Sequence, residues 1–100
     1  MDLIYHITAL DWWNKFSKED HYRSPTLSEE GFIHCSKLHQ VDGVLKRYYT
    51  NEKDLLLLYI DSALLTSPSK FELGTNQEFF PHVYGVINRS AIVKIEEISS

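Results

Sequence analysis

Three short segments of the sequence each place a histidine beside a hydroxyl or aromatic side chain. They are Ile4–Thr8, Gly31–Ser36 and Phe80–Gly85. Histidine titrates close to neutral pH, so its ring can transfer a proton or hydrogen-bond a bound ligand at cellular pH. We therefore expect His6, His34 and His82 to come together in one polar cleft, which is where function is to be sought.

The first two histidines stand at matching strand-to-helix junctions. His6 precedes Thr8, and His34 precedes Ser36, by two residues, so strand alternation puts each pair on one face. Both hydroxyl residues are expected to begin a helix, where free backbone N–H groups favour an anion such as a phosphate. Each histidine alone is equally well explained as a strand-end residue bonded to backbone, but the repetition favours a shared site.

The third segment places His82 and Tyr84 on one strand face, between Pro81 and Gly85. A core histidine packed on a tyrosine is one interpretation. The other is a pocket wall on which Tyr84 stacks against a planar ligand. Arg23, in a polar loop, is a candidate for binding phosphate, because its guanidinium can make two parallel hydrogen bonds.

Two further residues bear on the chemistry. Glu78 is the one carboxylate we consider as an acid or base, since it comes just before the third segment. The single cysteine, Cys35, excludes an intramolecular disulfide and is expected to be a packing residue. Three histidines can also bind zinc, but their separations (34 − 6 = 28 and 82 − 34 = 48 residues) match no compact metal motif.

Charge and motif content exclude several classes of protein. Ten Lys and Arg against 14 Asp and Glu give a net charge of −4, which disfavours a general nucleic-acid binder. A local positive pocket is still compatible with the sequence; its candidates are Arg23, Lys37, Lys46 and Arg47. Phosphate-loop, dinucleotide-binding, metalloprotease and nucleophile-elbow motifs are missing.

No segment of the sequence has the features of a membrane or export signal. The longest apolar run, Leu55–Ile60, is far shorter than the ~20 residues that a membrane span needs. The first residues have neither a charged start nor the apolar stretch of a signal peptide. We expect a soluble, cytoplasmic protein without membrane association.

The histidines must be positioned by a small set of strands and helices. Hydrophobic periodicity predicts strands at 3–7, 32–35, 55–60, 71–73, 82–86 and 91–98, and helices at 9–18 and 37–49. The run from Leu55 to Ile60 lacks polar alternation, which is typical of a central strand buried on both faces. Both helices come early and most strands late. The sequence therefore predicts one α+β domain over residues 1–100, with a mainly antiparallel or mixed sheet.

With these segments the chain resembles the domain-of-unknown-function 952 family over nearly its whole length. The matching strings are Ile4-Tyr5-His6-Ile7-Thr8, Tyr22-Arg23-Ser24-Pro25, Glu30-Gly31-Phe32-Ile33-His34-Cys35-Ser36, Ile60-Asp61 and Phe80-Pro81-His82-Val83-Tyr84-Gly85. That family is similar in fold to ADP-ribosyltransferases, which form a split, mostly antiparallel sheet around a cleft that binds NAD. The resemblance implies a small nucleotide, NAD or a related ADP-ribose compound, as the ligand.

The same resemblance implies roles for the histidines. His6 would contact NAD from the first strand, His34 would pack on the nicotinamide, and His82 would occupy the third position, where ADP-ribosyltransferases often carry a catalytic Glu. RNA 2′-phosphotransferases of this fold also lack that acid. The missing Glu leaves ordinary protein ADP-ribosylation in doubt, with binding or altered transfer chemistry open.

Three hypotheses follow. In the first, the protein is an ADP-ribosyltransferase-like enzyme with His34 and His82 as catalytic residues. Its ligand would be bound by a second set of residues: His6, Thr8, Arg23, Ser36 and Tyr84. The second is a non-catalytic nucleotide-binding module that keeps the cleft, and the third is a metal hydrolase that uses the three histidines.

Overall fold

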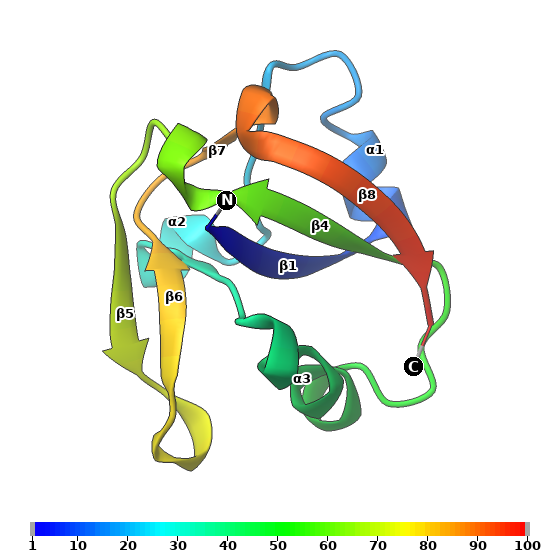
Figure 1. Cartoon of the computed structure of the whole chain (residues 1–100). Coiled ribbons are helices and arrows are strands. Elements are labelled where there is room, and N and C mark those ends of the chain that lie inside the picture. The colour runs from blue at the N-terminus through cyan, green and yellow to red at the C-terminus, as the bar shows by residue number, and fades with distance from the viewer. Residues whose placement is uncertain (1, 100) are drawn as a thin grey trace.

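The computed structural model describes residues 2–99 as a set of short strands and helices (Figure 1). The strands are β1 (Leu3–Ala9), β2 (His21–Tyr22), β3 (Ile33–His34), β4 (Leu55–Asp61), β5 (Ser69–Leu73), β6 (Phe79–Val83), β7 (Ile87–Asn88) and β8 (Ile92–Ile98). The α-helices are α1 (Leu10–Asn14), α2 (Leu27–Glu30) and α3 (Val41–Tyr48). Single 3₁₀ turns occur at Leu38–Gln40, Ser62–Leu64, Thr75–Gln77 and Arg89–Ala91.

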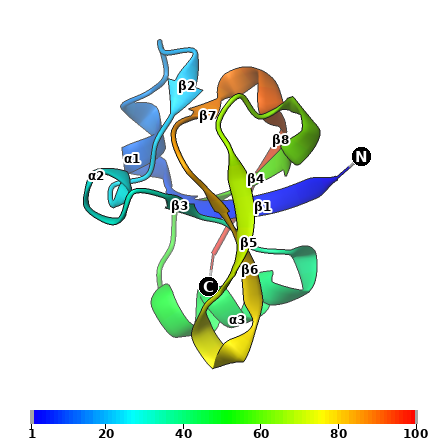
Figure 2. The ribbon, with the colours of Figure 1, turned by 90° about the vertical axis from the view of Figure 1, so that its left-hand side faces the viewer.

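All strand pairs in the described residues are antiparallel, and they form separate sheets. One sheet has the order β1-β4-β8, a second has the order β3-β6-β5, and β2 pairs with β7. Tyr5 and Ser36 join the first two sheets through reciprocal backbone hydrogen bonds of 2.8 and 2.7 Å. In both views the β5–β6 hairpin runs crosswise to β1 (Figures 1 and 2). The predicted α+β class with a mainly antiparallel arrangement is confirmed.

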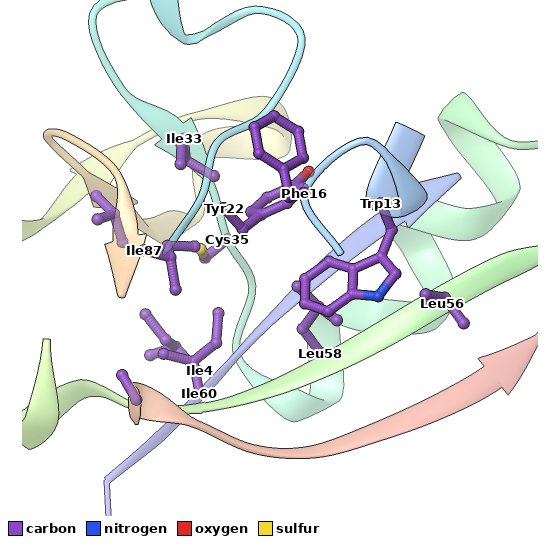
Figure 3. Packing of buried hydrophobic residues seen from close by; sticks show 12 residues of the cluster. Ile4, Trp13, Phe16, Tyr22, Ile33, Cys35, Leu56, Leu58, Ile60 and Ile87 are labelled. Carbon is purple, nitrogen blue, oxygen red and sulfur yellow. The ribbon is translucent and has the colours of Figure 1, made fainter. Parts of the chain in front are cut away.

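The core lies on both faces of the β1-β4-β8 sheet, because side chains alternate along β4. Leu56, Leu58 and Ile60 pack toward α1, in a cluster that includes Trp13 and Tyr22 (Figure 3). A second cluster covers the opposite face and joins Tyr5, Ile7, Leu55 and Leu57 to Val41 of α3. The prediction that β4 is central and buried on both faces is confirmed. Each such fully buried side chain contributes about 1.5–3 kcal/mol.

Both predicted helices are shorter than expected. Thr8 and Ala9 stay in β1, paired with Leu56 and Leu55, so Thr8 does not cap α1 as predicted. The second helix was expected from residue 37, but residues 38–40 form a 3₁₀ turn and the α-helix covers 41–48. Ser36 is held in the bridge to Tyr5 and does not cap it. Tertiary pairing of the flanking residues explains both differences.

The third histidine segment also folds differently from the expectation. The predicted strand 82–86 is shifted, because β6 covers Phe79–Val83 and the chain turns at Gly85 before β7. Gly85 has φ = +146°, and a Cβ there would lie 2.6 Å from the Ser67 hydroxyl oxygen. The residue is therefore a required turn glycine. Within residues 2–99, no helix is long and apolar enough to cross a membrane.

Candidate functional site

A cavity of about 690 Å³ opens between the two three-stranded sheets and α3. Its lining residues come from β1, β3, β5, β6, the three α-helices and the segments that flank them. The polar and aromatic ones include His6, Thr8, Trp12, Ser24, Thr26, Glu30, Phe32, His34, Ser36, Arg47, Tyr48, Tyr49, Thr75, Phe80 and His82. Ligand pockets for small molecules usually enclose about 300–1,000 Å³. All three histidines thus line this one cavity, although His6 and His82 are 76 residues apart in the sequence (82 − 6). The size of the cavity suits a small molecule.

His6 is buried at the inner end of the cavity. Its Nδ1 lies 2.7 Å from the carbonyl oxygen of His34, and its Nε2 lies 2.8 Å from the hydroxyl of Tyr22. The Tyr22 hydroxyl is in turn 2.9 Å from that of Thr8. Burial lowers the pKa of His6 to about 4, so the ring is neutral at pH 7. Both ring nitrogens of His6 are thus hydrogen-bonded to other residues of the protein. His6 was expected to contact the ligand, but neither nitrogen is left free to bond one.

His82 is placed by a carboxylate from the neighbouring strand. Its Nδ1 donates a hydrogen bond of 2.8 Å to Glu72, and the Tyr84 hydroxyl donates to the same carboxylate oxygen. These hydrogen bonds, that of Tyr84 first and that of His82 second, lower the pKa of Glu72. Because the carboxylate accepts from Nδ1, the neutral ring carries its lone pair on Nε2. Among residues 2–99 this nitrogen has no hydrogen-bond partner.

His34 stands at the cavity mouth, with 55% of its side chain exposed. Its Nε2 lies 3.1 Å from each carboxylate oxygen of Glu30, and this hydrogen bond is the main cause of a lowered Glu30 pKa. Gly31, with φ = +81°, ends α2 and turns the chain into β3 between these two residues.

Phe32 holds the two outer histidines together. Its ring stacks on that of His82 with 4.1 Å between centroids and an interplanar angle of 20°. The centroid of His34 lies 4.7 Å from that of Phe32 and 5.2 Å from that of His82. The His34 and His82 rings meet edge to face. These three residues form an aromatic wall of the cavity, in place of the wall expected from Tyr84.

The other predicted site residues divide into two groups. Thr8 and Ser36 are buried and line the cavity. Arg23 and Tyr84 do not line it. The Arg23 guanidinium lies over Phe16, 5.9 Å from the ring centroid, while Tyr84 packs behind the cavity wall, with its ring 5.5 Å from that of Phe32 and its hydroxyl bonded to Glu72. Of the four basic residues considered for a positive pocket, the cavity lining includes only Arg47.

Two candidate functional residues, Glu72 and Glu30, are identified by the structure and not by the sequence pattern. Glu72 is a diagonal neighbour of His82, since Lys70 pairs with His82 and Glu72 pairs with Phe80, so its role depends on a strand register that the sequence does not display. Glu30 stands four residues before His34, a spacing that by itself does not distinguish a site residue from an exposed surface charge. Glu78, considered as an acid or base, instead accepts a 3.2 Å hydrogen bond from Gln40 and is not part of the lining.

Cys35 is buried, and burial raises the pKa of its thiol. This fits its expected role in packing. No group of three His, Cys, Asp or Glu side chains within residues 2–99 is arranged to hold a metal ion. His6 is also a poor metal ligand, because each of its nitrogens already has a hydrogen-bond partner.

The fold and site define a small α+β protein with antiparallel sheets and a histidine-lined cavity. Residues 7–95 match the sequence model of the family described as "Protein of unknown function (DUF952)", and the chain belongs to this family. The expected family membership is thereby confirmed. No curated protein is similar to the chain.

Solved structures of one bacterial protein share the fold. The X-ray crystal structure of protein CC0527 from Caulobacter crescentus is 24% identical to this chain, with a TM-score of 0.87, and the match covers 96% of this chain and 85% of that one. The solution NMR structure of CC0527 is also 24% identical, with a TM-score of 0.83 and coverages of 99% and 86%. At this identity the likeness shows the fold alone.

Proposed function

We propose that the cavity binds NAD or a related ADP-ribose compound, and that His82, oriented by Glu72, is the acid–base group of a transfer reaction. One observation carries the proposal: the Glu72–His82 pair lies at a ligand-sized cavity, and Nε2 of His82 has no hydrogen-bond partner among residues 2–99. A carboxylate bound to one nitrogen of histidine fixes the tautomer and stabilises the cation that forms when the other nitrogen takes a proton.

The lining supports a nucleotide as the ligand. Phe32 and Trp12 present aromatic surface to the cavity, and Arg47 supplies a guanidinium that can bind phosphate. Most of the lining surface is apolar, as is usual in pockets where apolar surface provides affinity and polar groups provide orientation. The ligand assignment also uses the resemblance to ADP-ribosyltransferases, whose three site-bearing strands would correspond to β1, β3 and β6.

In this proposal Glu72 takes the place of the acid that ADP-ribosyltransferases often carry on the third strand. His82 stands where those enzymes often carry Glu, and Glu72 of the adjacent β5 brings a carboxylate to the same place through its 2.8 Å hydrogen bond. In the proposed reaction an acceptor hydroxyl or water attacks the ribose carbon C1′. The bond from that carbon to nicotinamide breaks, neutral nicotinamide leaves, and Nε2 of His82 takes the proton of the acceptor. His34, edge-on to His82, would assist from the cavity mouth.

Calorimetry and product analysis test the proposal. NAD, ADP-ribose and a 2′-phosphorylated oligonucleotide are titrated into the purified protein, and release of nicotinamide from NAD is followed by chromatography. We expect binding of NAD or ADP-ribose and slow nicotinamide release. His82→Ala should reduce that release at least 100-fold, the scale of a lost general base, with little change in binding.

His39→Ala is the matched control, because its side chain is 69% exposed and does not line the cavity. It should leave both binding and release unchanged. Binding that persists without turnover in the wild-type protein would favour the non-catalytic module. No heat with any of the three ligands, on folded protein, would overturn the proposal.

A further inference from the structure

Strand β8 lies at an open edge of its sheet. The order β1-β4-β8 places β4 on one side of it, and no strand within residues 2–99 pairs with its other side (Figure 1). Its five middle residues, 93–97, are all exposed, including the two apolar ones, Val93 (45%) and Ile95 (46%). An open strand edge with apolar side chains is a surface on which another strand can pair.

Hydrogen bonds at the two ends of β4 show which of its residues face β8. The N–H of Ser62 donates to the carbonyl of Asp2, and the N–H of Leu10 donates to the carbonyl of Asp54, both at 2.8 Å. These two pairs continue the register of β1 with β4 by one residue at each end. Hydrogen-bonded pairs alternate along antiparallel strands, so the even-numbered residues of β4 face β1 and the odd-numbered ones face β8.

The same alternation assigns the backbone groups of β8. Lys94 pairs with Tyr59 and Glu96 pairs with Leu57, both odd-numbered residues of β4. Lys94 and Glu96 therefore turn their backbone groups toward β4. Ile95, between them, turns its N–H and C=O groups away from the sheet, where a further strand can bond them.

The charges of β8 favour one register for the pairing of two identical strands. Antiparallel pairing of this kind sets one residue opposite its own copy at the centre. A centre at Lys94 would bring two ammonium groups face to face, and a centre at Glu96 would bring two carboxylates together, which destabilises the pair. A centre at Ile95 instead sets each Lys94 opposite Glu96 of the second copy. The strand is thus self-complementary about Ile95.

Tyr59 holds both charged side chains on one face of the sheet. Nζ of Lys94 lies 4.8 Å from the centroid of the Tyr59 ring, and Glu96 accepts a hydrogen bond of 2.8 Å from the Tyr59 hydroxyl. The opposite charges are therefore ordered before a second copy arrives. Less side-chain entropy is lost when they pair across an interface.

We propose that two copies of the chain associate through β8, antiparallel and centred on Ile95. The two Ile95 residues exchange backbone hydrogen bonds and pack against each other, while the Lys94–Glu96 pairs form on the other face. Two three-stranded sheets thereby become one continuous sheet. The bulge at Val93, where the register with β4 shifts, ends the paired segment. Because so short a segment makes a small interface, the dimer is reversible and depends on concentration.

Charge exchange tests the proposed register. Lys94→Glu places like charges opposite each other at both positions, and so does Glu96→Lys. Each variant alone, shown to be folded by its NMR spectrum, should weaken the dimer about 10-fold in sedimentation equilibrium. A mixture of the two variants sets opposite charges across the interface again and should recover the association of the wild type within about threefold. Lys18→Glu and Glu19→Lys, on an exposed turn, are matched controls and should leave the association unchanged.

Hydrogen exchange tests the pairing residue by residue. The amides of Ile95 and Glu97, which face away from β4, should exchange more slowly at high than at low protein concentration. The amides of Lys94 and Glu96 are bonded to β4 in the single chain, so their exchange should depend much less on concentration. An alternating pattern of this kind is the signature of strand pairing at this edge.

The proposal is independent of the nucleotide ligand, because the cavity lining includes no residue of β8 and the cavity stays open in the dimer. A protein that sediments as a monomer up to millimolar concentration would overturn it, and the charges of β8 would then serve to protect its edge. A dimer that both single variants leave intact, or that the mixture fails to restore, would place the interface elsewhere and overturn it as well.

Discussion

The proton positions in the cavity are set by the acceptors that each histidine faces. Glu72 faces Nδ1 of His82, while Glu30 faces Nε2 of His34, so the two rings turn opposite nitrogens away from their carboxylates: Nε2 of His82 and Nδ1 of His34. Within the described residues, neither exposed nitrogen has a protein partner. Two such bases, with ring centroids 5.2 Å apart, suit a site in which one group accepts a proton and the other hydrogen-bonds a second ligand atom.

Glu72→Gln tests whether the carboxylate governs His82. Glutamine has nearly the same shape but no charge, and its amide can present N–H to Nδ1, which would favour the wrong tautomer. We expect nicotinamide release from NAD to fall about 100-fold, and nitrogen-15 NMR to show hydrogen moving from Nδ1 to Nε2 of His82. Glu97→Gln, on the exposed face of β8, is the control and should change neither readout.

His6 makes the stability of the protein sensitive to acid. Its pKa is about 4 in the folded protein against 6.5 in the unfolded chain, so the unfolded state binds more protons as the pH falls from 6.5 to 4. The free energy of unfolding should therefore decrease over this window by on the order of 3 kcal/mol from His6 alone, with no effect at pH 7 or above.

Urea denaturation at pH 7 and pH 4.8 measures this loss. Between these two pH values Glu30 and Glu72 contribute little, because the carboxyl groups of the unfolded chain, with a pKa of 4.5, take up few protons above pH 4.8. His6→Gln should be less stable at pH 7 but should lose less stability between the two pH values. An equal loss in wild type and variant would show that another group titrates.

At the scale of elements, the local sequence pattern predicted some helices and strands well. In other places, pairing with distant parts of the chain decided where an element begins or ends. The apolar run 55–60 defined β4 almost to its ends, because a strand buried on both faces needs no alternation. The second helix, predicted over 37–49 from hydrophobic periodicity, is not buried at its two ends: Leu38 is 64% and Tyr48 59% exposed. Tyr48 lines the cavity and Leu38 faces solvent. Helix periodicity does not reveal whether a neighbouring element covers such positions.

Glycine substitutions distinguish a required turn from a tolerated helix position. Gly85→Ala should destabilise the protein by about 1–3 kcal/mol, because φ is +146° and the new Cβ would lie 2.6 Å from the Ser67 hydroxyl. Gly43→Ala, inside α3, meets only the flexible Arg47 side chain at 3.1 Å and should stabilise by up to about 1 kcal/mol. Thermal unfolding of both variants checks the contrast; equal effects would contradict it.

At the scale of the whole molecule, the site exists because two sheets meet. The sequence identified the three histidine segments, but the geometry of the site depends on long-range pairings that it does not encode locally. The Tyr5–Ser36 bridge sets β3 against β1, and the β5–β6 register brings Glu72 to His82. For the same reason Arg23, one residue after β2, was expected in a site that it does not line, and the sequence did not distinguish Arg47 from the three other candidates for a positive pocket.

A ligand in this cavity touches both sheets and α3, so its binding should stabilise the whole fold and not one loop. At a concentration 100 times its dissociation constant, a ligand that binds only the folded state adds about 2.7 kcal/mol. For a domain of this size that corresponds to a rise in melting temperature of roughly 10–20 °C. Thermal unfolding with ADP-ribose measures it.

Hydrogen exchange then locates the effect. Amides of β5 and β6 should gain protection together with those of β1, because the ligand would bridge Thr8 on one sheet and His82 on the other. Arg47→Ala should reduce the rise in melting temperature by weakening the phosphate contact, while Lys46→Ala, one residue away and outside this lining, serves as its control. A rise in melting temperature without added protection of β5 and β6 would place the ligand elsewhere, since a molecule filling this cavity cannot stabilise β1 and leave the opposite wall free to open.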